Sequence, residues 1–493
     1  MLSRRWWQTQ CVAAMVLLAA AGTAFAQAED LGPLSADISG FGQPLPAVAA
    51  HRSDMALFLA GQRLFSTPLS IPILGPLFNN RTCVACHFQP TMGGSGEFIS
   101  EAHTRSDTSG LPVHTFAVDN ILRGGSQSQG AYTIFAHGLA AVPLGCEITD
   151  PNCKLSPCQQ QEAQLKGFSP GLPICDPTSA AFANGDNCTA QRQSTNLFGA
   201  GLVEAVADDT LIALAKSEPT ATRGVPRLLT EFGAQRVARF GWKDDGATLR
   251  TFVTLATSNE LGLTTPDAPQ ENTTCADGVT QFGILLDAGQ EPEDTPDATG
   301  HAMIDRIVDF LRALAPPPRL SADDDNNYRG SDDHGGRGHW NRGRDPQGNN
   351  NSQVMQGEQI FSSIGCAGCH TPTLVTAPDP SQFIPPTTGG TPISPTLNRA
   401  LANQTFHPFS DFLLHDMGSL GDGITSGTAG PTMMRTAPLW GVRSKVRLLH
   451  DGRADNIATA IILHDGEGLD SAQQFENLSA SDQAALLSFL NTL

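Results

Sequence analysis

Apolar residues recur at helical spacing between Ile304 and Leu314, which predicts an amphipathic helix. A run of prolines that begins at Pro316 ends this predicted helix. Other stretches repeat parts of the pattern or resemble one another, namely residues 61–65, 357–361 and 488–493. Residues 61–65 and 357–361 are predicted to lie in the helix that enters each half, and residues 488–493, which resemble 309–314, in the helix that closes the second half. The chain is therefore predicted to be mainly α, with two related sets of helices and long loops between them.

The first 26 residues have the layout of a secretory signal peptide. Arg4 and Arg5 precede an apolar run at residues 12–21, and Ala24 and Ala26 fit an Ala-x-Ala cleavage site. A membrane anchor is the alternative, but it needs about 20 apolar residues, more than this run supplies. We therefore expect a periplasmic or secreted protein that starts near residue 27 and does not insert into a membrane.

Composition and charge narrow the set of partners. Charged residues make up only 16% of the chain, and 49 glycines and 34 prolines indicate long connections between elements. The net charge is −19. Such a charge argues against nucleic acid and anionic membranes as partners, and it favours a basic protein partner.

Residues 321–353 contain almost no apolar side chains and are predicted to be a flexible linker. Several aspartates in it could form a calcium patch, although a solvated acidic tether is the favoured interpretation. These are Asp323, Asp324, Asp325, Asp332 and Asp333.

Two Cys-x-x-Cys-His motifs carry the strongest chemical signal. The first consists of Cys83, Cys86 and His87, and the second of Cys366, Cys369 and His370. Cysteines three residues apart lie on one face of a helical turn and can bond the two vinyl groups of a haem, while the histidine ligates the iron. A redox or zinc-binding cysteine pair does not require the histidine. We predict two covalently bound c-type haems, with His87 and His370 as iron ligands.

The motifs predict two cytochrome c-like haem domains, residues 27–320 and 354–493, joined by the linker. The first domain holds a Cys-rich insertion at residues 140–195, where disulfides are expected to replace a core. The pairing stays open, and a zinc cluster is the disfavoured alternative because these cysteines lack Cys-x-x-Cys spacing. The cysteines concerned are Cys146, Cys153, Cys158, Cys175 and Cys188 in the insertion, and Cys275 after it.

A further correspondence links Trp242 with Leu449. Trp242 and Glu260 are 18 positions apart, and so are Leu449 and Glu467. The equal spacing suggests that one ancestral structural element occurs twice in the chain, once beside each haem. The alternative is coincidence between two turns that precede helices, because a few residues constrain a long period weakly.

Taken together, these residues resemble the dihaem oxidoreductases related to bacterial dihaem cytochrome c peroxidases and to MauG, in particular the branch described as dihaem peroxidases or thiol oxidoreductases. The resemblance covers most of the chain from about residue 60 onward, except the Cys-rich segment and the linker. It rests on residues 75–79, 93–96, 196–202, 240–243, 414–418, 435–441 and 450–454.

The resemblance implies that peroxide is reduced at the amino-terminal haem and that electrons enter through the carboxy-terminal haem. Trp242 falls at the position of a tryptophan between the haems, and Glu260 at that of an acid over the open face of the first haem. A carboxylate there can move a proton between the oxygens of a peroxide. The alternatives are a solvated helix residue for Glu260 and ordinary packing for Trp242.

Leu449 stands where many relatives have a methionine ligand to the carboxy-terminal iron, and leucine cannot ligate. His450 is then the predicted sixth ligand, with His415 and Met417 as weaker candidates. At the first haem, His103 is a candidate gating ligand, but a histidine in a polar surface loop is the favoured interpretation.

Arg435 and Arg453 could pair with haem propionates or form surface ion pairs.

We expect an exported dihaem peroxidase that receives electrons from a small redox protein such as a cytochrome c. Calcium between the haem domains and a homodimer are both compatible with the resemblance. Two other functions stay open. One is MauG-like or oxygenase-type oxidation of a protein or organic substrate, and the other is a non-enzymatic dihaem electron carrier.

Overall fold

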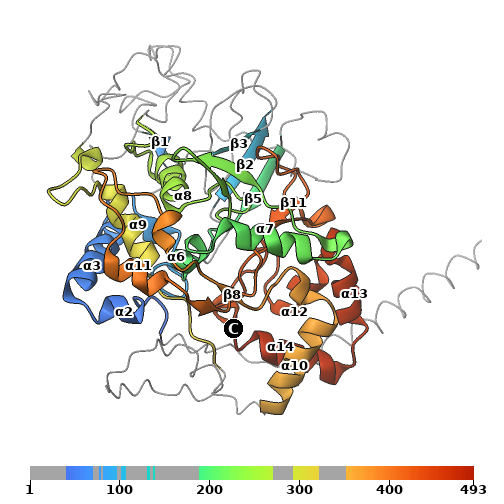
Figure 1. The fold of residues 1–493 in the computed structure, drawn as a ribbon. Coiled ribbons are helices and arrows are strands. Elements are labelled where there is room, and N and C mark those ends of the chain that lie inside the picture. The colour runs from blue at the N-terminus through green and yellow to red at the C-terminus, as the bar shows by residue number, and fades with distance from the viewer. Residues whose placement is uncertain are drawn as a thin grey trace, which may run out of the picture. The chain divides into compact units, whose positions relative to one another are not determined.

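Residues Ser39–Leu493 form one compact unit in a computed structural model of the chain (Figure 1). The other unit, Met1–Ile38, contains the predicted signal peptide and lies outside the described residues. The structure describes residues 40–69, 77–78, 81–96, 101–106, 130–133, 137–138, 188–269, 292–320 and 351–493. The predicted disulfides and the predicted calcium patch rest on residues whose side chains are outside this description.

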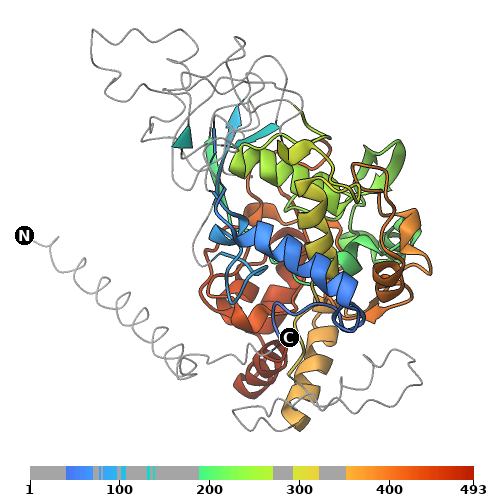
Figure 2. The ribbon, with the colours of Figure 1, turned by 90° about the vertical axis from the view of Figure 1, so that its left-hand side faces the viewer.

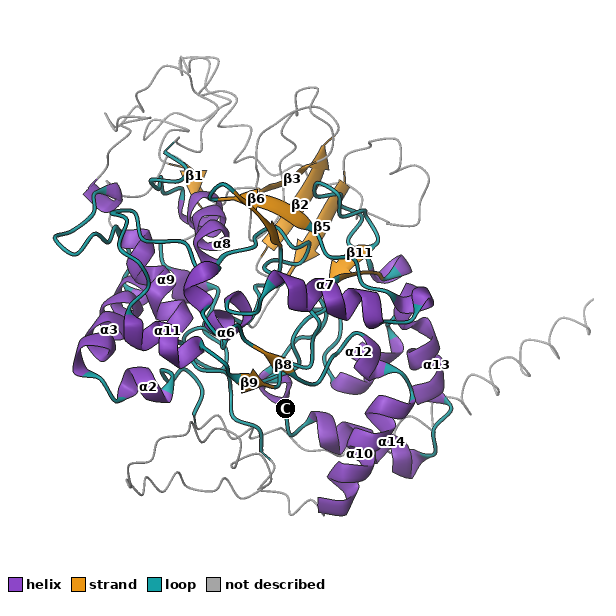
Figure 3. Cartoon of the chain, viewed as in Figure 1, coloured by secondary structure: helices purple, strands orange, loops and turns teal. Residues whose placement is uncertain are grey.

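The described part of the chain is rich in helices and has little sheet, which is compatible with the predicted mainly α class (Figure 3). Long connections separate the elements, as the glycine and proline content predicts. The α-helices are α2 Pro46–Ala49, α3 Arg52–Ser66, α6 Ala200–Glu204, α7 Asp208–Ser217, α8 Leu249–Ala256, α9 Met303–Ala313, α10 Asn351–Ser363, α11 Pro395–Leu401, α12 Ile457–Ile462, α13 Leu469–Glu476 and α14 Ala480–Leu490. Because α10 begins at Asn351, the last residues of the predicted linker are helical.

The strands form small antiparallel sheets. The largest has the order β3-β2-β5. Its strands are β2 Glu101–Ser106, β3 Gly130–Thr133 and β5 Cys188–Arg192, and the two-stranded sheets are β1 Leu77–Phe78 with β4 His137–Gly138, β6 Leu228–Glu231 with β7 Ala234–Val237, β8 Leu374–Val375 with β9 Thr405–Phe406, and β10 Leu414–Asp416 with β11 Met433–Arg435. His103 was predicted to lie in a loop, but it is part of β2 and is opposite Thr133 of β3 and Ala190 of β5.

Two pairs of helices cross closely at a glycine. Helix α3 crosses α9 where Gly61 meets Phe310, and α10 crosses α14 where Gly357 meets Phe489 (Figures 1 and 2). A Cβ atom at Gly61 would lie 2.6 Å from Cβ of Phe310, and one at Gly357 would lie 2.7 Å from Cβ of Phe489. Glycine is therefore needed for the close approach. These are the helices predicted from the apolar pattern, and they form two equivalent crossings.

Two large hydrophobic clusters hold most of the core in the described part of the unit. The first contains Phe58, Phe65 and Phe310 from α3 and α9, and the second contains Phe361 and Phe489 from α10 and α14. Residues of α11 and β9 also belong to the first cluster, although they follow the second haem motif in the sequence. The two halves of the chain thus share part of their core. In the ranges described, no helix is both long enough and apolar enough to cross a membrane.

Candidate functional site

The first Cys-x-x-Cys-His motif forms a tight turn close to the end of α3. Cys83–Ala85 is a 3-10 helix capped by Thr82, whose hydroxyl accepts a backbone hydrogen bond at 3.3 Å. The same hydroxyl donates to the carbonyl of Phe65 at 3.1 Å, which ties the turn to α3. Nδ1 of His87 lies 3.0 Å from the carbonyl oxygen of Gly94. Because a carbonyl only accepts, Nδ1 carries the proton, and Nε2 has the lone pair that a metal needs.

The second motif repeats this arrangement. Cys366–Gly368 is a 3-10 helix that the chain enters through Gly365, at a φ of +93°. Nδ1 of His370 lies 2.9 Å from the carbonyl oxygen of Phe409. Burial, with a smaller contribution from His464, lowers the pKa of His370 to about 4. Its imidazole is therefore neutral at pH 7, as a metal ligand must be.

Both pairs of cysteines fit the attachment of a haem. Burial raises the pKa of Cys83 to about 12 and that of Cys366 to about 12, which indicates apolar surroundings. Among the described residues, the motif cysteines form no disulfide. Attachment would replace each thiol by an apolar thioether, which suits such surroundings. The donor set and its environment thus fit two c-type haems.

A phenylalanine packs against each motif histidine in the same way. The ring centroids of Phe65 and His87 are 6.2 Å apart with an interplanar angle of 53°, and those of Phe361 and His370 are 6.4 Å apart with an angle of 54°. Each phenylalanine comes from the helix that precedes its motif. The two turns therefore have matching surroundings on the side of the motif histidine.

A second histidine faces His370, and the sequence analysis did not find it. The ring centroid of His464 lies 6.4 Å from that of His370, with an interplanar angle of 61°. Nδ1 of His464 donates to the carbonyl of Ala460 at 2.7 Å, and burial lowers the pKa of His464. Two imidazoles that share a metal at about 2 Å have their centroids roughly 6 Å apart. His464 therefore lies where a second axial ligand would lie.

His450, the predicted sixth ligand, contacts Trp242 instead. Their ring centroids are 6.2 Å apart in an edge-on arrangement. The backbone N–H of Gln193 donates to the backbone carbonyl of His450 at 2.6 Å. His450 is buried, and this burial lowers its pKa to about 4. Ligation of the second iron by His450 remains a prediction. The ring of His370 is in contact with His464, however, and this contact favours His464 as the sixth ligand.

His415, a weaker candidate ligand, has both ring nitrogens bonded to carboxylates. Nε2 lies 2.9 Å from Asp411 and Nδ1 lies 2.7 Å from Glu467. Burial disfavours a charged ring, but the hydrogen bonds with Asp411, Cys369 and Glu467 outweigh it and raise the pKa of His415 to about 12. Ligand atoms of Cys369, Asp411 and His415 lie within 4.8 Å of one another. Attachment of a haem at Cys369 would remove its thiol from this group, which leaves an imidazolium between carboxylates.

Trp242 is hydrogen-bonded to a segment that contacts both halves. Its Nε1 donates to the carbonyl of Gln193 at 2.8 Å, and the side chain of Gln193 donates to the carbonyl of Gly96 at 2.8 Å. The next residue, Ser194, donates to the carbonyl of Cys86 at 2.6 Å. Together with the contact to His450, this connects Trp242 to the first motif and to the second half of the chain. Trp242 thus contacts both halves of Ser39–Leu493. These halves, each built around one Cys-x-x-Cys-His motif, are called the first and the second unit below.

Glu260 lies in a π-helix, Thr257–Leu261, that continues α8. Such a bulge is rare and often occurs at functional sites. Glu260 is half-buried, and its neighbours Leu261 and Leu263 pack against Cys83 of the first motif. The structure thus brings the predicted acid to the region of the first motif.

The two halves correspond, but with a register that differs by one residue from the predicted one. Isolated β-bridges close two equivalent turns, Phe240 with Gly246 and Leu448 with Ala454. Each turn leads to an N-cap whose side chain accepts from the third residue of the next helix, Thr248 before α8 and Asn456 before α12. Aligned in this way, Trp242 corresponds to His450 rather than to Leu449.

The same alignment matches Ala256, the last residue of α8, with His464. An imidazole faces His370 at this position of the second unit, whereas the first unit has a methyl group that cannot ligate a metal. Glu260 follows Ala256 by four residues, which is about one helical turn. The matching N-caps are the signal from which the sequence could have predicted His464.

The two arginines proposed for propionates have different surroundings. Arg435 is buried, and its Nε donates to the carbonyl of Gly241 at 2.6 Å and lies 3.7 Å from Asp244. Arg453 is exposed and forms an ion pair with Asp451. Arg453 therefore makes the surface ion pair that was the alternative for both residues.

A buried network surrounds Lys243. Its Nζ donates to the carbonyl of Gly430 at 2.9 Å and lies 2.8 Å from Asp422, and Arg192 bonds to the same carboxylate at 2.6 Å. Burial alone would raise the pKa of Asp422, but Lys243 and Arg192 hold it far below its ordinary value. This network fixes the segment that carries Trp242 to the carboxy-terminal half.

Residues 344–493 match the sequence family described as "Di-haem oxidoreductase, putative peroxidase". The match covers 150 of the 493 residues and confirms, for this part of the chain, the resemblance to dihaem oxidoreductases seen in its motifs. A search of curated proteins finds no match. Among solved structures, the chain is similar to hydrazine synthase from Kuenenia stuttgartiensis pressurised with 20 bar xenon, at 13% identity and a TM-score of 0.29, with 68% of this chain and 79% of that chain covered. At this score the likeness supports no conclusion about fold or activity.

Proposed function

We propose that the protein is an exported dihaem c-type oxidoreductase with two cytochrome c-like units. It reduces hydrogen peroxide at the amino-terminal haem with electrons delivered through the carboxy-terminal haem. The observation that carries this proposal is the difference between His464 and Ala256 at one position of two otherwise matching units. It supports one saturated iron, suited to electron transfer, and one iron with a face open to a small oxidant.

When bound, the haems supply the iron chemistry that passes single electrons and that reacts with peroxide. Nε2 of His87 would hold the iron of the first haem, and Nε2 of His370 and His464 would hold the iron of the second. In each case a backbone carbonyl holds the proton at Nδ1. This fixes the tautomer and the ring orientation, which makes the imidazole a better ligand.

Glu260 is the proposed catalytic acid and base. Reduction of one hydrogen peroxide to two waters consumes two electrons and two protons, and one proton must move from the near to the far oxygen as the O–O bond breaks. A carboxylate one turn beyond Ala256 is suited to accept and return that proton. Glu260 lies within the π-helix Thr257–Leu261, so the wider turn of this helix sets the direction of its backbone.

Trp242 and His450 are the proposed connection between the units. Their rings are in edge-on contact, and Gln193 bonds to both residues through its backbone. Packed aromatic rings and hydrogen bonds provide a short through-protein path for electrons. The position of Trp242 beside Gln193 and Ser194 supports this role.

We further propose a small basic redox protein, such as a cytochrome c, as the electron donor. The net charge of −19 would attract it, and Ile462, Leu463 and Leu469 expose apolar surface on either side of His464. Turnover with such a donor should fall as salt screens the attraction. Turnover that does not change with ionic strength would contradict this part of the proposal.

Peroxide turnover of the Glu260→Gln variant tests the function. We expect the variant to bind both haems and to lose about 10²–10⁴-fold in turnover. Glu476→Gln on the exposed face of α13 removes a comparable charge and should keep the activity of the wild type. Turnover of Glu260→Gln within a few-fold of the wild type would exclude Glu260, and a wild type inert to peroxide with two saturated haems would favour the electron carrier.

A further inference from the structure

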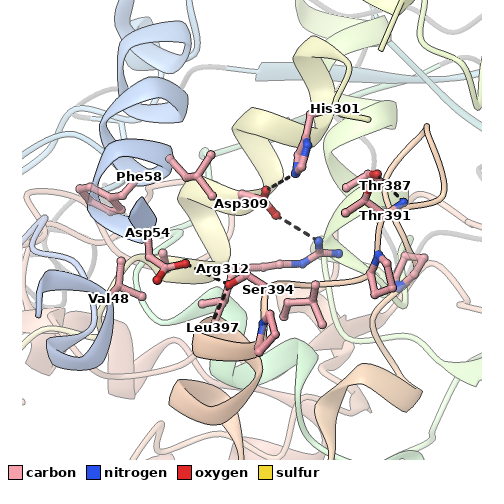
Figure 4. A pocket seen from close by; sticks show the side chains of 16 residues that line it. Val48, Asp54, Phe58, His301, Asp309, Arg312, Thr387, Thr391, Ser394 and Leu397 are labelled. Atoms are coloured by element: carbon pink, nitrogen blue, oxygen red, sulfur yellow. Dashed lines mark hydrogen bonds and ion pairs between the residues drawn. The ribbon is translucent and has the colours of Figure 1, made fainter. Parts of the chain in front are cut away.

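A cavity of about 410 Å³ lies between α3, α9 and the segment that leads into α11 (Figure 4). Its walls are mostly apolar and include Val48, Phe58, Ile393 and Leu397, together with several prolines of the α11 segment. Cavities of this size commonly bind small molecules. The cavity is lined from both halves of the chain, because α3 precedes the first haem motif and α11 follows the second.

The cavity is separate from the haem site. Phe58 is in contact with Phe310, and Phe310 with Phe65, at centroid distances of 5.0 and 5.3 Å. Phe65 then packs against His87. Three aromatic rings therefore stand between the cavity and the first motif histidine, and a molecule in the cavity would not reach the metal ligand.

Most charges at the cavity are paired with one another. Arg312 binds Glu204 through Nε at 2.7 Å and through Nη2 at 3.2 Å, and its Nη1 lies 3.6 Å from Asp309. Asp309 also lies 3.2 Å from Nε2 of His301 and raises the pKa of that histidine. Acidic and basic side chains alternate in this network, part of which is seen in Figure 4. Their charges therefore balance one another without a further ion.

Asp54 is different. Its carboxylate lines the cavity and is only 8% exposed, and it accepts one hydrogen bond, from the hydroxyl of Ser394 at 3.1 Å. Among the residues that the structure describes, no lysine, arginine or histidine forms an ion pair with it. A carboxylate that is largely buried and has no cation beside it favours a positive charge at this end of the cavity.

We propose that the cavity binds a small organic cation, a protonated amine with an apolar body. The ammonium group would donate to the carboxylate of Asp54. The body would lie against Phe58, which comes one turn later on the same face of α3, and against Leu397 of α11. Because Ser394 also caps α11, the ligand would strengthen the contact between the two halves. This inference does not depend on the proposed peroxidase activity.

Calorimetric titration of the full-length holoprotein with butylamine, cyclohexylamine and benzylamine at pH 7 tests the proposal. We expect saturable binding of at least one amine and binding of the matching alcohol that is about tenfold weaker or more, since an ammonium–carboxylate bond in a buried site contributes about 1.4 kcal/mol or more. Asp54→Asn should lose the preference for the amine. Asp209→Asn, which removes an exposed aspartate from the first turn of α7, should retain it.

A second variant covers the case in which Asp54→Asn does not fold. Ile393→Phe keeps the carboxylate and fills the apolar end, so it should weaken benzylamine at least as much as butylamine. The proposal is overturned if no amine binds up to about 10 mM, if amine and alcohol bind equally, or if Asp54→Asn and Ile393→Phe both bind amines like the wild type.

Discussion

Replacing Gly357 with alanine should force α10 and α14 apart. The added Cβ atom would lie 2.0 Å from the carbonyl oxygen of Ala485 and 2.7 Å from Cβ of Phe489, whereas carbon atoms in contact are about 3.5 Å apart. Overpacking of this kind costs roughly 1–3 kcal/mol. Because the closest atoms belong to the backbone of Ala485, the cost should lie at the upper end of this range, about 2–3 kcal/mol. The better helix propensity of alanine offsets about 1 kcal/mol. The net loss in the free energy of unfolding should then be about 1–2 kcal/mol.

Thermal unfolding of the holoprotein, followed by circular dichroism and by haem absorbance, measures this loss. A change of 1–2 kcal/mol lowers Tm by roughly 1–2 °C in a compact unit as large as Ser39–Leu493. Gln359→Ala, on the exposed face of the same helix, is the control and should change stability by about 0.5 kcal/mol or less. If Gly357→Ala unfolds at the temperature of this control, the close crossing is not what requires glycine.

Three further predictions concern side chains between the two units. Lys243→Met should lower the free energy of unfolding by about 1–3 kcal/mol in denaturant titrations, because Asp422 loses one of its two buried partners and keeps Arg192; no measurable loss would contradict this. Burial raises the pKa of Glu218 from 4.5 to about 7, so stability should fall as pH rises between these values. Glu218→Gln should flatten that dependence, and an unchanged slope would refute the assignment. Trp242→Phe should slow the oxidation of the second haem after peroxide is added, as seen by stopped-flow absorbance, whereas an unchanged rate would remove Trp242 from the path.

The sequence was informative where local patterns have fixed geometry. The Cys-x-x-Cys-His motifs predicted both turns, because i and i+3 spacing places both cysteines on one face. Apolar periodicity and the stop at Pro316 predicted α9, and the resemblance between residues 61–65 and 357–361 predicted parts of α3 and α10. None of these predictions required knowledge of distant contacts.

Contacts between distant segments were not predictable in the same way. His464 lies 94 positions after His370, and only the fold shows that their rings face each other. The bonds of His415 to Asp411 and Glu467 likewise depend on how β10 packs. The correspondence of Trp242 with His450 was missed by one residue, because two short turns fix a register weakly without their bridges and N-caps.

Electron paramagnetic resonance of the ferric holoprotein and of its His464→Ala variant tests the central claim most directly. The wild type should show one low-spin haem with two imidazole ligands and one high-spin haem. The variant should lose the low-spin signal while it retains both covalently bound haems. A low-spin signal that persists unchanged in His464→Ala, or a wild type in which both haems are low-spin, would contradict the account.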